Sequence, residues 1–323
     1  MSIKKHLYGI TMLYGTYHFF CVFENDAHLP YYKGSTFRGV FGRALKKVVC
    51  ALKRQECGQC LLKQRCVYAL VFETSEAMEV PEGSRIVSPP HPFVIEPPLT
   101  TETKFHKGVS FDFNLLLFGE SNNTLPYFIY AFDQMGKIGI GKKISGKRGR
   151  FALKEVRHKE QIIYSDVDRK LNATDSIEKL SIPAATDYSE SGFRLKLILE
   201  TPLRLKFENR LKADLPFHVF VRAMLRRASS LLNCYGKGEP PLDYRGLVNR
   251  AKAIQIIDTN LNWFDWKRYS HRQDKSMLMG GMIGSVIFEG KIGEYLPLIE
   301  FCSKVHLGKQ TSFGLGKIKA ERI

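Results

Sequence analysis

The sequence lacks any long uninterrupted apolar run. No stretch of its 323 residues reaches the roughly 18 consecutive apolar residues that a membrane-spanning helix needs. Lys4 and Lys5 stand near the N-terminus, but Tyr8, Thr11 and Tyr14 interrupt the residues that follow them, so the apolar core of a signal peptide is also missing. We therefore expect a cytoplasmic protein that does not bind a membrane.

Acidic side chains are scarce compared with basic ones. Asp and Glu number 32 against 49 Lys and Arg, which gives a formal net charge of +17. Hydrophobic residues make up 44% of the chain, so a folded core is expected, and the length allows two domains of ordinary size. This excess of positive charge favours a polyanionic partner over a small neutral metabolite.

The common glycine-rich nucleotide motifs are absent. Residues 306–317 (HLGKQTSFGLGK) are rich in glycine, but their spacing matches neither the Walker pattern nor the dinucleotide fingerprint. Glycine permits close approach of the backbone, and lysine adds positive charge, so the loop suits a phosphate backbone. A plain tight turn is the alternative. The predicted RNA contacts in this loop are Gly308, Gly314, Gly316 and Lys317, with Lys309 assigned to the reacting phosphate.

The seven cysteines do not predict a disulfide framework, because four of them are clustered in a chain expected in the cytoplasm. Cys50, Cys57, Cys60 and Cys66 follow one another in the order C-x6-C-x2-C-x5-C. Four thiolates this close can hold one tetrahedral Zn²⁺, which predicts a structural zinc site. An iron–sulfur cluster and buried thiols are the alternative interpretations.

The first half of the sequence predicts a strand within residues 4–24 and a helix capped by Ser35 or Thr36 that runs to about Leu52. An alternating strand over residues 109–118 and a helix near residues 126–135 follow. Residues 137–159 carry nine Lys or Arg and one acid, which predicts a basic hairpin at about 136–159. Solvated basic faces are the alternative. The predicted RNA contacts are Arg38, Arg43, Lys142, Lys143, Lys147, Arg148 and Arg150.

The second half begins after a polar segment, about residues 160–190, that looks like a linker or a peripheral insertion. A strand pair from Gly192 is interrupted by Pro202, and a helix capped by Asp214 runs to Tyr235. Residues 263–274 mix aromatic rings with cations, which suits single-stranded RNA; a strand with Trp263 and Tyr269 in the core is the alternative. The predicted RNA contacts here are Arg222, Arg226, Arg268, His271 and Arg272.

Glycine-rich loops occupy matching late positions in the two halves, at residues 136–142 and 308–317, and each half begins with strand followed by a basic helix. This duplication predicts an α+β protein of two tandem ferredoxin-like domains, each an antiparallel sheet backed by helices. We expect residues 1–185 to form the first domain, with the cysteine cluster as an insertion at about 50–66. Residues 190–323 form the second.

An ordered set of short motifs resembles the precursor-crRNA-processing endoribonucleases of the RAMP superfamily. The set comprises residues 35–45 (STFRGVFGRAL), 66–68 (CVY), 92–97 (PFVIEP), 268–273 (RYSHRQ), Gly280 with Gly281, and 306–316 (HLGKQTSFGLG). The resemblance implies tandem ferredoxin-like domains, CRISPR repeat RNA as substrate, and cleavage without a metal or other catalytic cofactor. It also makes CRISPR effector-complex and adaptation proteins candidate partners. Many members carry a catalytic histidine in or near the first helix, and residues 35–52 contain none.

RNA cleavage without a metal needs a base for the 2′-hydroxyl, an acid for the 5′-oxygen and cations for the phosphate. Histidine suits the proton transfers. His306 is the first candidate because it adjoins the glycine loop and Lys309, and His28 and His218 are the others. Lys309, Arg268 and Arg272 are expected to stabilise the phosphate. The alternative function is a non-catalytic RNA-binding RAMP subunit of a CRISPR effector complex.

Overall fold

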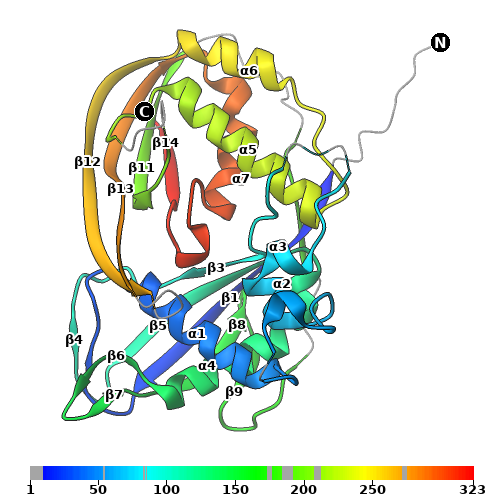
Figure 1. Ribbon diagram of the computed structural model, residues 1–323. Helices are drawn as coiled ribbons and strands as arrows, with labels where there is room; N and C mark the ends of the chain where they lie inside the picture. Colours follow the sequence, from blue (N-terminus) through cyan, green and yellow to red (C-terminus); the bar gives the residue numbers. More distant parts are fainter. Residues whose placement is uncertain are drawn as a thin grey trace.

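The computed structural model describes residues 10–53, 55–82, 84, 86–172, 177–183, 192–206, 212–270 and 275–323, without the side chains of residues 268–270, 275 and 276. The chain forms two halves, each an antiparallel sheet with helices packed against it (Figure 1). This is the α+β architecture of tandem ferredoxin-like domains, which the duplicated pattern predicts. The predicted boundary between residues 185 and 190 falls outside the described residues.

The N-terminal half is built on the sheet β3-β5-β1-β8-β9, with β10 paired to the first residues of β1. Alternate residues of β1 point into the core, which Phe19 and Phe23 occupy. Its strands are β1 (Thr11–Phe23), β3 (Phe93–Glu96), β5 (Ser110–Phe118), β8 (Phe151–His158), β9 (Gln161–Ser165) and β10 (Glu178–Ser181).

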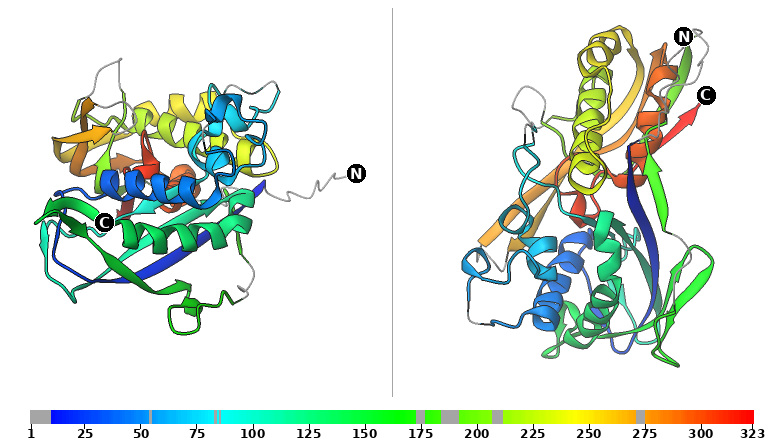
Figure 2. Two further views of the ribbon diagram at one scale, coloured as in Figure 1. Left: turned by 60° about the horizontal axis from the view of Figure 1, so that its bottom comes forward. Right: turned by 90° about the vertical axis from the view of Figure 1, so that its right-hand side faces the viewer.

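Helices α1 (Gly34–Val49) and α4 (Leu125–Ile138) lie side by side on this sheet (Figure 2). One face of α1 forms an apolar stripe that points into the core: Phe37, Val40, Phe41, Ala44 and Leu45 are buried. Phe41 of α1 stacks on Phe132 of α4 with ring centroids 4.3 Å apart. The predicted cap is wrong, because Lys33 is the N-cap residue and Ser35 and Thr36 lie inside the helix.

A small second sheet, β4-β2-β6-β7, stands at one end of the N-terminal half (Figure 1). Its strands are β2 (Ala27–His28), β4 (Lys104–Phe105), β6 (Ile140–Ile144) and β7 (Lys147–Gly149). Strands β6 and β7 pair antiparallel around Ser145 and Gly146, so the core of the predicted basic hairpin is a real hairpin. Short helical segments complete this half: η1 (Cys57–Gln59), α2 (Val67–Phe72), α3 (Thr74–Ala77) and η2 (Gly119–Thr124).

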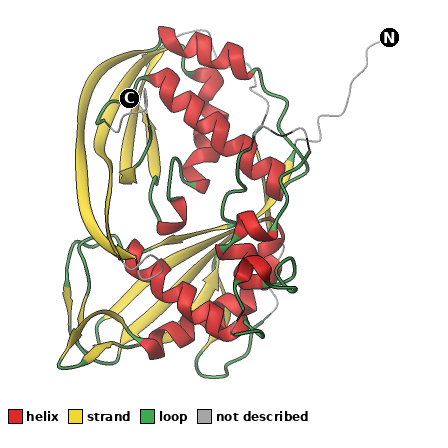
Figure 3. Cartoon of the chain, in the orientation of Figure 1, coloured by secondary structure: helices red, strands yellow, loops and turns green. Residues whose placement is uncertain are grey.

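The C-terminal half is built on the sheet β12-β13-β11-β14, against which α5 and α7 pack (Figure 3). Its strands are β11 (Phe193–Leu203), β12 (Gln255–Ser270), β13 (Lys275–Gly290) and β14 (Ile318–Arg322). Its helices are α5 (Phe217–Tyr235), α6 (Tyr244–Arg250), η3 (Ala251–Ala253), η4 (Gly293–Tyr295), α7 (Leu296–Val305) and η5 (Thr311–Phe313).

Three sequence-based predictions differ from the structure. The segment around residues 160–190 contributes β9 and β10 to the N-terminal sheet and is therefore more than a linker. Pro202 does not end the strand, since β11 runs through it to Leu203, but the pairing of β11 with β13 shifts register between Leu199 and Leu203, on either side of this proline. Pro216, rather than Asp214, is the N-cap residue of α5, because its fixed φ already suits the position before the helix.

The two halves share one core. Met12, Tyr14, Val94, Leu116 and Phe118 of the N-terminal sheet belong to the same buried cluster as the apolar faces of α5 and α7. The halves therefore act as one packed unit at their junction. Among the described residues, no helix combines the length and apolar character needed to cross a membrane.

Candidate nucleic-acid interface

The terminal glycine-rich loop lies inside the junction between the halves. Leu307 and residues 311–316 are buried, whereas Lys309 is exposed. Thr201 Oγ1 donates a hydrogen bond to Gly314 O at 2.8 Å, and Tyr32 OH, just before α1, donates to Phe313 O at 2.8 Å. The loop thus connects β11 of one half with the start of α1 in the other.

The glycines of this loop are explained by packing. Gly308, Gly314 and Gly316 have φ values of +88°, +82° and +77°, where other residues are strained. A Cβ atom on Gly316 would lie 1.8 Å from Leu307 O, and one on Gly314 would lie 2.6 Å from Ile95 O. A phosphate cradle at Gly314 and Gly316 does not fit this burial. Only Lys309, at the exposed edge beside Gly308, is accessible to RNA.

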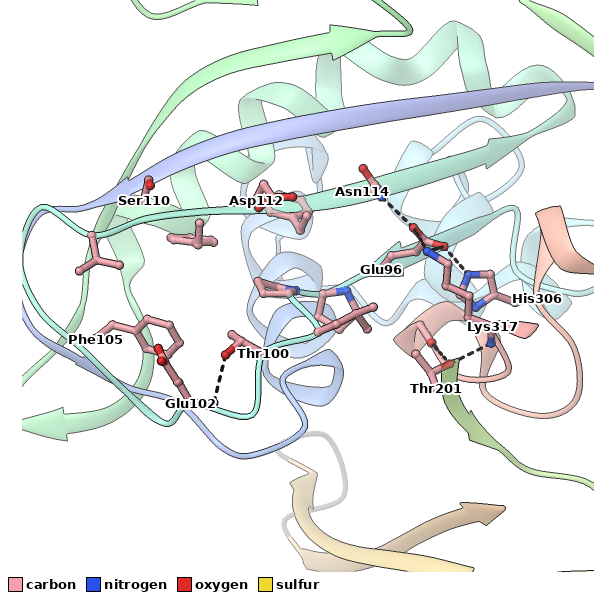
Figure 4. Close-up of a pocket in the computed structure, with 17 residues that line it drawn as sticks. Glu96, Thr100, Glu102, Phe105, Ser110, Asp112, Asn114, Thr201, His306 and Lys317 are labelled. Atoms are coloured by element: carbon pink, nitrogen blue, oxygen red, sulfur yellow. Dashed lines mark hydrogen bonds and ion pairs between the residues drawn. The ribbon is translucent and has the colours of Figure 1, made fainter. Parts of the chain in front are cut away.

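His306 pairs with Glu96 across the junction. Its side chain is fully buried, its Nε2 lies 2.7 Å from Glu96 Oε1 at the end of β3, and its Nδ1 lies 3.0 Å from Leu315 O (Figure 4). Both partners are acceptors, so both ring nitrogens donate when the two bonds are made. Both ring nitrogens of His306, the residue predicted to be the acid or base of RNA cleavage, are therefore bonded to other groups of the protein. This geometry favours a structural role for His306.

Glu96 carries a charge at this buried position. Asn114 Nδ2 donates to its Oε2 at 2.8 Å, and Lys317 Nζ lies 3.2 Å from its Oε1 (Figure 4). Burial alone would raise the pKa of Glu96, but the hydrogen bond and charge of His306, together with Lys317 and Asn114, lower that pKa to about 2. Lys317, predicted to contact RNA, is thus half-buried and paired.

A cavity of about 430 Å³ opens beside this pair (Figure 4). It is lined by Asn114, Thr201 and residues 97–100, and also by the carboxylates of Glu96, Glu102 and Asp112. Glu96 is paired with His306 and Lys317, which also line the cavity, but Glu102 and Asp112 leave negative charge there that would repel a phosphodiester. The cavity is therefore not a candidate RNA-binding surface.

Arg38 of α1 makes a second contact across the junction. Its Nε donates to Ser312 Oγ at 2.9 Å, and its guanidinium lies 4.5 Å from the ring centroid of Phe313 and 4.8 Å from that of Phe72. Its Nη2 lies 3.1 Å from Nε2 of His91. The pKa of His91 is lowered to about 4, first by burial and then by the charge of Arg38. Arg38, predicted to contact RNA, is half-buried here between the two halves.

The basic hairpin does present cations to solvent. Lys142, Lys143 and Lys147 are exposed. Arg43 of α1 is also exposed, and its pKa is lowered, first by burial and then by the charge of Arg148 of β7. The structure therefore brings two predicted RNA contacts, Arg43 of the helix and Arg148 of the hairpin, close enough for their charges to interact. Arg150 is exposed and pairs with Glu24 at 3.5 Å.

His28 stands between two lysines in the small sheet. In the ladder, His28 of β2 is directly opposite Lys104 of β4 on one side and Lys142 of β6 on the other. Side chains of directly opposed residues point to the same face of a sheet, with Cβ atoms roughly 5 Å apart. His28 is half-buried and both lysines are exposed. This arrangement brings an imidazole, which can take up or give a proton, together with two cations at the surface.

Two family models match the chain. Residues 11–176 match the AF_1859 N-terminal domain, and residues 197–318 match the CRISPR-associated endoribonuclease Cas6. The chain therefore belongs to the AF_1859 family through its N-terminal half, and its C-terminal half carries a RAMP-type Cas6 endoribonuclease domain. An uncharacterized protein of Archaeoglobus fulgidus is 25% identical over 299 residues, which cover 90% of this chain and 91% of that protein.

Solved structures of Cas6 proteins share the fold. Thermus thermophilus Cas6 matches with a TM-score of 0.53 and 11% identity, covering 96% of this chain and 99% of the other. A chain of a partial Cas6-RT-Cas1–Cas2 complex matches with a TM-score of 0.57 and 11% identity over 98% of this chain. The chain spans only 46% of the length of that longer chain.

The remaining predicted residues that the structure describes stand on elements other than the small sheet that carries His28. Arg222 and Arg226 are exposed on α5, and burial, followed by the charges of Arg222 and Lys252, lowers the pKa of His218. Tyr235, at the other end of α5, donates to Pro90 O of the N-terminal half, so His218 lies roughly 25 Å away along the helix axis. His271, Arg272 and the Arg268 side chain lie outside the described residues.

The four clustered cysteines are partly buried free thiols. The pKa of Cys57 is raised, chiefly by burial and in small part by Cys66 and Cys50. These three thiols therefore lie close enough to interact electrostatically. Within the described part of the chain, no group of three or more His, Cys, Asp or Glu is arranged to hold a metal ion. Structural zinc remains a prediction from the cysteine spacing.

Sequence reasoning missed three residues that the structure makes prominent. Glu96 and His91 complete the two junction contacts, and Lys104 flanks His28. Residues 92–97 stand in the family-like motif, which could have drawn attention to Glu96. Lys104 could not be found from the sequence, because it lies opposite His28 only through the pairing of β2 with β4, and each of these strands has two residues.

The packing of the glycine loop predicts opposite effects of alanine at two glycines. Gly316→Ala should lower the free energy of unfolding by more than about 1 kcal/mol, because the positive φ strains alanine and its Cβ meets the Leu307 carbonyl. Gly39→Ala, on the exposed face of α1 with no atom within 4 Å of the added Cβ, should raise it by about 0.5–1 kcal/mol. Urea unfolding measures both; equal stability of the two variants would contradict this account of the loop.

The Glu96 contact predicts a pH-dependent contribution to stability. Because the folded pKa lies near 2 and the ordinary value is 4.5, the ionised carboxylate stabilises the fold above pH 4.5, and this contribution is lost as the pH falls toward 2. Its size is about 3 kcal/mol. Glu96→Gln should therefore be less stable than wild type at pH 6 and lose less stability below pH 4.5, as urea unfolding would show. Glu300→Gln, exposed on α7, is the control and should follow wild type.

Proposed function

We propose that this protein cleaves precursor crRNA without a metal ion, by attack of a ribose 2′-hydroxyl on the adjacent phosphate. The products are a 2′,3′-cyclic phosphate and a 5′-hydroxyl end. The match of residues 197–318 to the CRISPR-associated endoribonuclease Cas6 supports the substrate class, CRISPR repeat RNA, and the reaction class. The observation that carries the mechanism is the placement of His28 between Lys104 and Lys142.

His28 is the proposed proton-transfer residue. Neutral imidazole takes the proton of the 2′-hydroxyl while O2′ bonds to phosphorus and the bond from phosphorus to O5′ breaks. The ammonium groups of Lys104 and Lys142 stabilise the negative charge that develops on the phosphate oxygens, and one of them supplies the proton for O5′. All of these groups come from this chain, so the reaction requires no cofactor.

The other predicted residues divide into two groups in this proposal. The exposed cations of the hairpin and of α1 hold the phosphate backbone, and Lys309 adds a contact at the edge of the glycine loop. Arg222 and Arg226 form a separate basic surface on α5. His306 and Arg38 hold the two halves together, so the site keeps its shape while the RNA is bound.

A non-catalytic RNA-binding subunit of a CRISPR effector complex is the second candidate. Two observations favour it: helix α1 contains no histidine, and the histidine of the glycine loop is buried in an ion pair. Association with adaptation proteins is a further proposal, supported by the shared fold with a chain of the Cas6-RT-Cas1–Cas2 complex.

The mechanism predicts which variants lose cleavage. With excess protein, cognate repeat RNA and EDTA, wild type should produce 2′,3′-cyclic phosphate ends. His28→Ala should cleave roughly 100- to 10,000-fold more slowly, because proton transfer is lost. Lys142→Ala should slow cleavage about 10-fold or more, because one phosphate cation is lost. Lys143→Ala is the matched comparison: alternate residues of β6 face opposite sides of the sheet, so this variant should weaken RNA binding but leave the cleavage rate of bound RNA unchanged.

Each other outcome contradicts a stated part of the proposal. Binding without cleavage by wild type would favour the RNA-binding subunit. Full activity of His28→Ala, with loss of cleavage in a folded His306→Gln, would move the proton transfer to His306. Cleavage that EDTA abolishes would contradict the metal-independent reaction.

A further inference from the structure

The β12–β13 hairpin reaches beyond its own sheet to the N-terminal half. Pairing of β13 with β11 ends at Met282, whereas β12 and β13 continue to pair with each other as far as Ser270 and Lys275. The extension runs from the C-terminal sheet to the start of α1 (Figure 1, Figure 2). A two-stranded ribbon is marginally stable by itself, so contacts with the N-terminal half must hold it in place.

Those contacts form a row of four aromatic rings. The centroids of Tyr32 and Trp266 are 4.9 Å apart, those of Trp266 and Phe264 are 5.5 Å apart, and those of Phe264 and Tyr31 are 5.6 Å apart. At the inner end, Tyr32 and Trp266 pack on the buried cluster of Met279, Phe313 and Leu315. At the outer end, 55% of Tyr31 is exposed. The row thus begins in the core and ends at the surface.

The exposed ring of Tyr31 is held in place on both sides of the chain. The neighbouring Tyr32 is fixed by its bond to Phe313 O, and Nζ of the buried Lys33 donates to Tyr31 O at 3.2 Å and to Thr100 O at 2.5 Å. Phe264 supports part of the ring, with the planes inclined at 51°. An aromatic surface that is both rigid and exposed loses little conformational entropy when a flat ligand stacks on it.

The surroundings of Tyr31 identify the flat ligand as a nucleobase. Tyr31 follows His28 by three residues on the segment that joins β2 to α1. Lys104 and Lys142, which flank His28 in the small sheet, are the exposed cations of this region. Aromatic rings next to cations recognise unpaired bases, which stack on the ring while the cation contacts phosphate.

We propose that Tyr31, supported by Phe264, is a stacking platform for one unpaired nucleobase of the RNA substrate, close to the scissile phosphate. This subsite rests on the proposed function, because the RNA bound there is the repeat RNA. Stacking accepts any base, so the platform selects an unpaired nucleotide at a fixed distance from His28 and does not read its identity. It positions the RNA and takes no part in proton transfer.

The test uses non-cleavable repeat RNA, with a 2′-deoxy nucleotide at the scissile position and 2-aminopurine placed in turn at each unpaired nucleotide. Wild type should quench the fluorescence at one position near the scissile phosphate. Tyr31→Ala should abolish that quenching and weaken binding roughly 5- to 100-fold, which is the range for loss of one stacked base. Tyr31→Phe should retain both, and Tyr31→Leu, which keeps apolar contact with Phe264, should lose the quenching.

Tyr130→Ala is the matched control, because Tyr130 on α4 is also 55% exposed and should not affect binding. Since binding is measured without cleavage, an inactive wild type would overturn the proposed reaction while the platform is still tested by fluorescence. Unchanged quenching and affinity in a folded Tyr31→Ala would overturn the platform. Unchanged RNA binding by Tyr31→Ala together with loss of a protein partner would assign the ring to protein docking instead.

Discussion

The buried contact between Glu96 and His306 is the constraint on which the arrangement of the two halves depends. Glu96 ends a strand of the N-terminal sheet and His306 begins the glycine loop of the C-terminal half, so the 2.7 Å contact joins two separately built units. A buried carboxylate without a partner is strongly destabilising, whereas a fully paired one is tolerated. Asn114, Lys317 and Leu315 O complete the pairing, and few other orientations of the halves could satisfy the same groups.

This constraint separates the residues that hold the fold from those that we propose to face RNA. The polar side chains of the junction are directed at one another, and the cavity beside them includes the carboxylates of Glu102 and Asp112. Cations that face solvent stand on the small sheet and on α1. The rigid junction fixes where β2, Tyr31 and the rings of β12 lie relative to one another. Preorganisation of this kind allows a peripheral site to act without a deep pocket.

The sequence predicted the fold well because its evidence is local. Apolar residues at helical spacing in α1 and alternating residues in β5 indicate their elements without knowledge of the rest of the chain. The site was harder to predict because it depends on contacts between distant segments. The glycines of the terminal loop indicated a backbone conformation that other residues rarely adopt. The sequence could not show that Ile95 O and Leu307 O would lie against Gly314 and Gly316. His306 was predicted to be the acid or base of the reaction, but its partner Glu96 stands in another domain and could not be inferred from the sequence.

Glycines with positive φ have a different role in each of the two duplicated loops. In each half a helix, α4 or α7, is followed by glycines with positive φ and then by a strand. In the C-terminal half these glycines let the chain pack into the junction. In the N-terminal half, a Cβ atom on Gly141 would lie 2.3 Å from His28 O, so glycine there allows β6 to approach β2. That approach sets Lys142 opposite His28. The same conformational freedom that builds the interdomain contact thus also assembles the proposed site.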